Sequence, residues 1–293
     1  MKVSNRLEKI AEAAGNARLL ADVGCDHGYT ALCALRERRA ERVLCMDINP
    51  GPLSTAAANL QKTGFLDRAA FLLSDGLRAA ALSEDALSLG EREKRDAFRK
   101  KMGEKGDFGI GADLGLGEAL SLPDVIVLSG MGGQLITKIL SLLPTNGAVC
   151  TEETEAALLR SAKAYLSGVE RLILSPQSEP ERVRELLWEK LDFHILDEKM
   201  LCDEGKYYLI LTAAPGRDKD YALEDENRAL KLRYGTCLYE NRDEVFHCYL
   251  EEEQRKIKGI LETLSDGGRR AELSGQIEEI EFFLKHWDEK RNT

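Results

Sequence analysis

Features that define several common classes of protein are missing from this sequence. None of the seven cysteines forms a C-x-x-C pair, and their odd number and scattered spacing argue against both a disulfide framework and a zinc cluster. We therefore expect no metal site and a reducing, cytoplasmic environment. No stretch is long and apolar enough to cross a bilayer, and the charged pattern MKVSNRLEKIAEAAG predicts an amphipathic helix rather than a signal peptide or a membrane span.

An excess of positive charge is missing as well. The formal net charge is -10, so the surface as a whole disfavours polyanions. Contact with a nucleic acid would then depend on local basic segments, for which residues 36–42 and 91–105 are the candidates. Such runs are more often a solvated helix face or a loop, so neither by itself indicates a nucleic-acid site.

What the sequence does contain is an alternation of predicted strands and helices. Strands are expected at residues 19–23, 42–47, 70–73, 125–129, 171–174, 193–200 and 207–212, and helices at 29–39, 51–63, 133–143, 152–167 and 179–190. Apolar runs such as DVIVLSG indicate strands buried on both faces, which is typical of a parallel sheet covered by helices. The prediction is a doubly wound α/β fold. Because only a turn separates the last two strands, they should form an antiparallel hairpin at one edge.

Two segments interrupt this alternation. Residues 79–122 carry no clear strand signal and are expected to be an irregular insertion, in which GIGADLGLG is a flexible loop because no apolar strand precedes it. Residues 217–293 carry apolar residues at helical spacing on either side of Gly267 and Gly268, which predicts a helical hairpin. The length of 293 residues thus divides into a domain at 1–216 and a helical domain at 217–293.

The chemistry is expected at the glycine turn of ADVGCDHGYT, which follows the first strand. Gly24 and Gly28 occupy the outer positions of a G-x-G-x-G turn and Asp26 stands in the middle. Strand, glycine turn and helix in succession commonly hold a nucleotide-like cofactor. Asp47 ends the second strand, where a carboxylate can accept both ribose hydroxyls, and Asp75 follows the third strand, where an adenine amine could donate to it. These carboxylates predict an adenosine site.

Charge then selects the cofactor. NAD and FAD bring a pyrophosphate to the turn, and its repulsion by Asp26 would cost several kcal/mol. S-adenosylmethionine carries a positive sulfonium and a positive ammonium instead, so carboxylates favour it. Two alternatives stay open at this point. Asp26 could be only the N-cap of the next helix, and His27 could be packed at the helix start rather than in contact with substrate.

A series of motifs runs through the chain in order: VSNRLEKIA, ADVGCDHGYTALCAL, GPLSTAAANLQKTGF, LSDGL, VIVLSGMGGQLITKIL, RLILSPQSEPERVRELL and LCDEGKYYLIL. Together they resemble the bacterial tRNA adenine-22 N1-methyltransferases of the TrmK type. The resemblance covers roughly residues 3–214, and the C-terminal helices are similar to that family's coiled-coil appendage. It implies a Rossmann-like class I methyltransferase sheet of seven strands, S-adenosyl-L-methionine as methyl donor and tRNA as substrate.

The resemblance also implies the site residues. The cofactor-binding set is Asp22, Gly24, Cys25, Asp26, Asp47, Ile48, Asp75, Gly76, Gly130, Met131 and Gly132, and the catalytic set is Asp26, His27 and Tyr29. Adenine N1 has an in-plane lone pair, so its methylation needs positioning more than a base. The ring becomes positive, and the Asp26 carboxylate or the Tyr29 ring could stabilise it. The fourth strand is followed by SGMGG and not by the Asn or Asp-Pro-Pro motif that methylation of an exocyclic amine requires.

The sequence departs from the family near the expected entrance for the target base. Residues 175–177 read SPQ where the family has QPN, and the connection at 77–123 is much longer than the family's. Two other functions therefore stay open: a methyltransferase for another RNA or a small molecule, and a cofactor-binding RNA-binding or scaffold protein with little activity. A homo-oligomer is compatible with the sequence, which does not indicate one.

Overall fold

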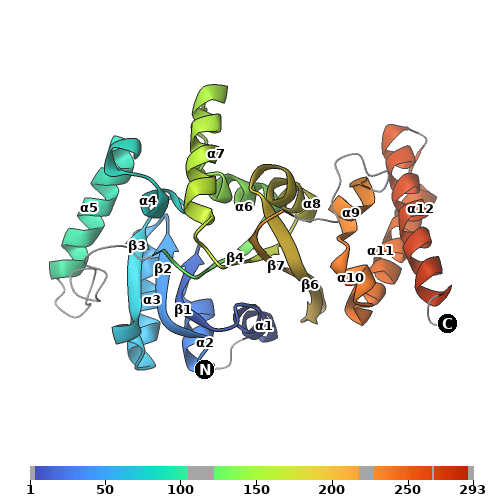
Figure 1. Cartoon of the computed structure of the whole chain (residues 1–293). Helices are drawn as coiled ribbons and strands as arrows, with labels where there is room; N and C mark the ends of the chain where they lie inside the picture. The colour runs from blue at the N-terminus through green and yellow to red at the C-terminus, as the bar shows by residue number, and fades with distance from the viewer. Residues whose placement is uncertain (1–3, 105–121, 218–227, 266, 290–293) are drawn as a thin grey trace.

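A seven-stranded sheet forms the centre of the protein (Figure 1). The computed structural model describes residues 4–104, 122–217, 228–265 and 267–289. The strand order is β3-β2-β1-β4-β5-β7-β6, and β1 to β5 are parallel, whereas β7 is antiparallel to both β5 and β6. The strands are β1 Ala17–Val23, β2 Ala40–Asp47, β3 Ala69–Leu73, β4 Val125–Met131, β5 Arg171–Pro176, β6 Phe193–Asp203 and β7 Lys206–Pro215. The predicted doubly wound α/β class and the antiparallel edge hairpin are confirmed.

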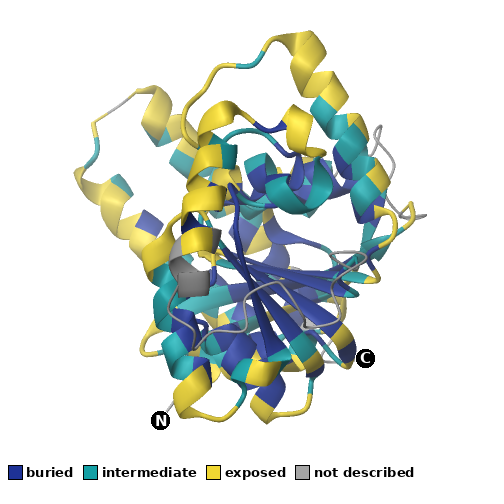
Figure 2. Ribbon diagram, turned by 90° about the vertical axis from the view of Figure 1, so that its left-hand side faces the viewer, coloured by how far each residue is buried: buried dark blue, intermediate teal, exposed yellow. Residues whose placement is uncertain are grey.

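Helices cover both faces of the sheet. They are α1 Asn5–Ala13, α2 Tyr29–Arg36, α3 Pro50–Lys62, α6 Gly133–Leu140, α7 Glu152–Leu166 and α8 Pro180–Glu185, which continues as a π-helical turn over Leu186–Lys190. Figure 2 shows the buried strands between helices whose outer faces are exposed. None of the helices in these described ranges is long and apolar enough to cross a membrane.

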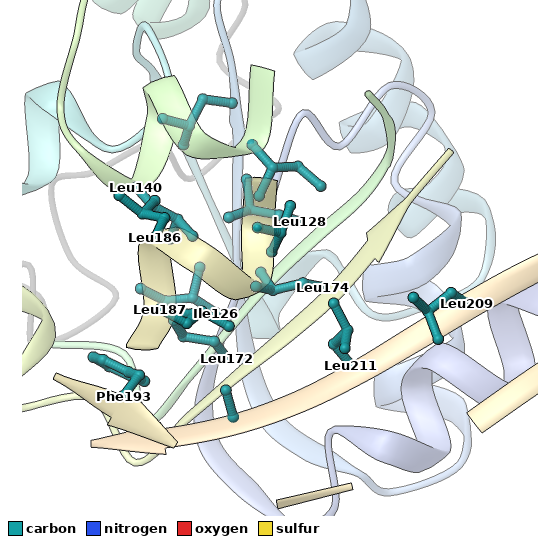
Figure 3. Close-up of a cluster of buried hydrophobic side chains, with 14 of the residues drawn as sticks. Ile126, Leu128, Leu140, Leu172, Leu174, Leu186, Leu187, Phe193, Leu209 and Leu211 are labelled. Carbon is teal, nitrogen blue, oxygen red and sulfur yellow. The ribbon is translucent and has the colours of Figure 1, made fainter. Parts of the chain in front are cut away.

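The hydrophobic core consists of two clusters, one on each face, because alternate residues of a strand point to opposite sides. Val125 and Val127 of β4 belong to the cluster under α1, α2 and α3, whereas Ile126 and Leu128 belong to the other. Figure 3 shows this second cluster, to which β4, β5, α6, the π-helical turn and the β6–β7 hairpin all contribute. The buried strands thereby fix the loops at their carboxyl ends.

The insertion is more regular than the sequence predicted. It contains α4 Arg78–Ala81, a short turn at Glu84–Ala86 and a 16-residue helix, α5 Leu89–Glu104. The expectation of an irregular segment is therefore wrong for these residues. A capping box starts α5: the Ser88 N–H donates to Glu91 Oε2 at 2.8 Å and the Glu91 N–H donates to Ser88 Oγ at 3.3 Å. The GIGADLGLG segment lies outside the described residues.

The C-terminal residues are helical, as predicted: α9 Arg228–Tyr234, α10 Cys237–Glu240, α11 Glu244–Thr263 and α12 Gly268–Glu289. They pack beside the β6 edge, on the right of Figure 1, and α10 and α11 contact β6. Phe246, Phe283 and Trp287 belong to the same hydrophobic cluster as the sheet residues Leu209 and Leu211. The helices are thus continuous with one face of the core, and a domain boundary at 216/217 stays a prediction.

A buried ion pair joins this helical part to the sheet. Arg184 Nε lies 2.8 Å from Glu198 Oε1, and both side chains are 1% exposed. Arg184 Nη1 donates to the carbonyl oxygens of Leu232 at 2.6 Å and Arg233 at 2.8 Å. The end of α9 therefore supplies acceptors that the buried guanidinium needs.

Candidate functional site

The glycine turn lies at the carboxyl ends of β1 and β4, where the strand order reverses and where sheets of this kind bind ligands. Gly24, Asp26 and Gly28 have φ angles of 73°, 48° and 70°, so all three adopt the left-handed conformation. A Cβ on Gly28 would lie 2.8 Å from the Cβ of Ala56, which explains the glycine at that position. The turn is therefore a close-packed backbone feature.

The backbone of the turn is tied to β2. The N–H groups of Gly24 and Cys25 donate to the Met46 carbonyl oxygen at 2.9 and 3.0 Å. The Cys25 side chain is buried, and a hydrogen bond with Cys45 together with burial raises the pKa of its thiol. Cys25, predicted to bind cofactor, thus keeps a neutral thiol inside the protein.

Asp22 lies beneath the turn and is 2% exposed. Its carboxylate accepts a hydrogen bond from the Ala31 N–H at 3.2 Å, so it satisfies a donor in the first turn of α2. Burial raises the pKa of the Asp22 carboxyl to about 7, and the neighbouring Asp47 carboxylate adds to the shift. A positive ligand group close to this turn would relieve that unfavourable burial.

Asp26 does not cap the helix. Gly28 is the N-cap residue of α2, and within the described turn no side chain makes the capping hydrogen bond. The alternative in which Asp26 serves only as an N-cap is therefore wrong. Its side chain is 74% exposed, and its Oδ1 lies 3.5 Å from His27 Nε2.

His27 and Tyr29 lie on the same side of the turn as Asp26. Their ring centroids are 5.7 Å apart, and 48% of the His27 side chain is exposed. The side chain of Asn59 in α3 donates to the His27 carbonyl oxygen at 3.0 Å and so fixes the backbone beneath it. His27 is thus open to a ligand instead of being packed inside, and the structure brings the three predicted catalytic residues together.

Asp47 ends β2 next to the turn and is partly buried. Its Oδ1 accepts from the Asn49 N–H at 2.9 Å. Burial raises the pKa of the Asp47 carboxyl, and the nearby Asp26 carboxylate adds to this effect. The predicted cofactor set contains four aspartates and no lysine or arginine, so the site as predicted favours a cation.

A second loop, at the end of β4, closes on the turn. A Cβ on Gly24 would lie 2.8 Å from Met131 Cε, and a Cβ on Gly132 would lie 2.8 Å from Ser178 Oγ. The Gln177 N–H donates to the Met131 carbonyl oxygen at 3.0 Å. The glycine turn, the Gly130–Gly132 loop and the SPQ segment are therefore assembled into one site at adjacent strand ends.

Asp75 lies at the end of β3 and is 7% exposed. Thr145, in the connection between α6 and α7, donates to both carboxylate oxygens, through its N–H at 2.9 Å and its hydroxyl at 2.5 Å. A Cβ on the neighbouring Gly76 would lie 2.8 Å from Ile139, and the side chain of Ile48 at the end of β2 is partly exposed. Sequence reasoning missed Thr145, which orients a predicted adenine-binding residue.

Arg6 is the second residue that sequence reasoning did not single out, although it stands in the VSNRLEKIA motif. Its guanidinium carbon lies 4.9 Å from the centre of the Tyr208 ring, and its backbone N–H donates to Asp203 at 3.3 Å. Arg6 Nη1 is shielded from water and has no hydrogen-bond partner among the described residues. It lies 4.0 Å from the position of a Cβ on Gly130, so an unsatisfied cationic donor lies beside the acidic site.

Comparisons with known proteins show which family this chain is similar to. A family model described as "Methyltransferase domain" matches residues 3–88, and one described as "tRNA (adenine(22)-N(1))-methyltransferase" matches residues 153–285. The tRNA (adenine(22)-N(1))-methyltransferase of Bacillus subtilis (strain 168) is 26% identical over 280 residues, which cover 96% of this chain and 93% of the relative. The chain is thus similar to this family of tRNA methyltransferases, through the family model at residues 153–285 and through the Bacillus subtilis relative along nearly its whole length.

Solved structures of similar proteins establish the fold. A Streptococcus pneumoniae protein in complex with S-adenosyl-L-methionine is 24% identical with a TM-score of 0.64, covering 97% of this chain and all 100% of that one. The TrmK of M. capricolum, in complex with S-adenosyl-homocysteine, is 19% identical with a TM-score of 0.65, covering 97% and 99%. The family's Rossmann-like methyltransferase fold is therefore the fold of this chain. No group of three or more His, Cys, Asp or Glu residues that could hold a metal occurs in the described part of the chain.

Proposed function

We propose that this protein transfers the methyl group of S-adenosyl-L-methionine to N1 of an adenine in tRNA, at position 22. The observation that carries the proposal is the cluster of Asp22, Asp26 and Asp47 around the turn at the switch point of the sheet. Similarity to the tRNA (adenine(22)-N(1))-methyltransferases supports it, because the Bacillus subtilis relative is named for this reaction. Action on tRNA also implies a cytoplasmic protein.

The residues of the turn fit a cationic cofactor. The Asp22 carboxyl is buried and Asp47 is partly buried, so their negative charge is poorly compensated by water. A pyrophosphate would increase this repulsion, whereas a sulfonium and an ammonium would reduce it. When bound, the cofactor supplies an electrophilic methyl group on a positively charged sulfur.

The ribose, the adenine and the carboxylate of the cofactor each have a residue that could bind them. Asp47 would accept the ribose hydroxyls, and Asp75 together with Ile48 would hold the adenine. The remaining charged group of the cofactor is its carboxylate. Arg6 fits this group, since its Nη1 is an unpartnered donor beside Gly130.

The protein's part in the reaction is to position the adenine. Its N1 lone pair is available without loss of a proton, so Asp26 and His27 need not act as a base. The Asp26 carboxylate and the Tyr29 ring lie at the exposed side of the turn, where they would stabilise the positive ring that forms. At the end of β4, Ser129, Gly130 and Met131 offer no side-chain carbonyl or carboxylate for an exocyclic amine, which favours attack by N1.

The experiment is methyl transfer to an unmodified tRNA transcript with labelled S-adenosyl-L-methionine, followed by digestion and identification of the labelled nucleoside. We expect N1-methyladenosine, and no label in a matched transcript with guanine at position 22. Label in another nucleoside, or only in a small molecule, would identify a different methyltransferase. Cofactor binding without transfer would favour the scaffold function.

A further inference from the structure

The insertion helix α5 is packed on the β3 edge of the sheet, on the left of Figure 1. Phe98 is 4% exposed and belongs to the same hydrophobic cluster as Phe71 and Leu73 of β3. Burial of an aromatic side chain of this kind contributes about 2 to 3 kcal/mol. The helix is therefore a fixed part of the fold.

A second contact fixes the first turn of α5. Arg78 Nε donates to Glu91 Oε1 at 2.7 Å, and Arg78 Nη1 donates to the Leu142 carbonyl oxygen at 2.7 Å. Although burial opposes it, hydrogen bonds from Arg78 and Ser88 lower the pKa of the Glu91 carboxyl. Arg78 is 6% exposed, so this ion pair is well shielded from solvent. The start of α5 thus has a defined position relative to the end of β3.

Between α5 and the sheet lies a cavity of about 140 Å³, which we call the β3 cavity. Ile48, Ser74 and Asp75 line it from the strand ends, and Leu87 and Gly90 line it from α5 and the residues just before it. This volume corresponds to about four or five water molecules in the liquid, which is the scale of one flat heteroaromatic ring.

The chemistry of the β3 cavity matches such a ring. Ile48 and Leu87 provide apolar surface, and the Asp75 carboxylate, oriented by Thr145, provides an acceptor for an exocyclic amine. The α5 side of the lining is more polar, with the charged residues Glu91, Lys94 and Arg95. Two of its lining residues, Ile48 and Asp75, are in the set predicted to bind the cofactor. The cavity therefore lies where that prediction puts the adenine.

We propose that α5 is the outer wall of the adenine pocket and that Gly90 keeps this pocket open. The inference rests on the proposed function, because it takes the cofactor to be an adenosine compound. A Cβ added to Gly90 would meet no atom within 4 Å, and the φ angle of Gly90 is not positive. A side chain at position 90 would thus enter open space without straining the backbone.

The test is the variant Gly90→Leu in the full-length protein, with binding of S-adenosylhomocysteine measured by calorimetry. We expect affinity to fall at least about tenfold, because leucine would occupy the volume of the ring. The midpoint of thermal unfolding should stay the same or rise, since leucine favours a helix over glycine. Gly259→Leu is the matched control: it also lies in a helix, has open space around its Cβ, and should bind normally.

Binding of adenosine, which lacks the amino-acid part of the cofactor, tests the contact between α5 and the adenine ring separately from the rest of the site. Its binding should weaken in Gly90→Leu by a similar factor, because the lost contact is with the ring. Equal binding of both ligands by Gly90→Leu and the wild type would overturn the role of α5 and leave the proposed function intact. If the wild type bound neither S-adenosylmethionine nor S-adenosylhomocysteine, both proposals would fall together.

Discussion

Asp22→Asn should change how the free energy of unfolding depends on pH. Burial raises the pKa of Asp22 from 3.8 to about 7 in the folded protein, whereas the unfolded chain keeps the ordinary value. Between these two values the folded state holds a proton that the unfolded state has lost. A rise in pH therefore favours unfolding, and this loss of stability is complete once the pH exceeds the folded pKa.

The size of the effect follows from the shift. A difference of about three pKa units corresponds to about 4 kcal/mol over the whole range, of which about 2 to 3 kcal/mol falls between pH 5 and pH 8. Asparagine has no charge to bury and can still accept the hydrogen bond that the Ala31 N–H donates at 3.2 Å. Relative to the wild type, the variant should gain about 2 to 3 kcal/mol in stability as the pH rises from 5 to 8.

Urea unfolding, followed by circular dichroism without cofactor at several pH values, measures this difference. Comparing the two proteins at each pH cancels the titration of groups that they share. Asp67→Asn, at an exposed position in a short turn, is the control for replacing a carboxylate by an amide. If the stabilities of Asp22→Asn and the wild type changed in parallel from pH 5 to pH 8, the buried-carboxylate argument would be refuted.

Three further substitutions test the site and the fold. Asp47→Ala should weaken S-adenosylmethionine binding about a hundredfold, or about 2 to 3 kcal/mol, in calorimetry, because both ribose contacts are lost; unchanged affinity would contradict this. Asp26→Asn removes the negative charge and preserves the backbone of the turn, because asparagine also tolerates the observed φ of 48°. It should weaken S-adenosylmethionine more than the uncharged-sulfur product, and equal losses would argue against an electrostatic role. Arg184→Met should lower the free energy of unfolding by about 3 to 5 kcal/mol, because Glu198 would stay buried without its partner; a urea midpoint near that of the wild type would be inconsistent with this.

The sheet could be predicted because its signal is local. Continuous apolar runs mark the parallel strands, and the hairpin turn before Lys206 marks the antiparallel pair. The strands observed are longer than those runs, since backbone pairing extends past the apolar residues, as between Asp203 of β6 and Lys206 of β7. The helix α5 was missed because its sequence is dominated by charged residues, so that Phe98, a large buried apolar side chain, gives no helical periodicity. Its clear sequence signal was the capping box formed by Ser88 and Glu91.

The site could be predicted in part for the same reason. Its carboxylates follow strand ends, where sequence patterns place them. Arg6 and Thr145 reach the site from distant segments: Thr145 lies 70 residues from the Asp75 that it contacts, and Arg6 lies 197 residues from Asp203. No periodicity connects residues so far apart, and which of them meet is decided by the packing of the sheet.

The contacts of Arg184 bear on how the chain folds while it is being synthesised. Two of the acceptors of its guanidinium are carbonyl oxygens 48 and 49 residues further along the chain. Until those residues have left the ribosome, burying Arg184 beside Glu198 would leave part of a charge unsatisfied. The parallel strands β1 to β5 can associate earlier, because their mutual contacts lie within residues already made. The β6–β7 edge is complete only when α9 has been synthesised. A nascent chain that stopped after β7 and before α9 would therefore expose an incomplete sheet edge, which could pair with other chains.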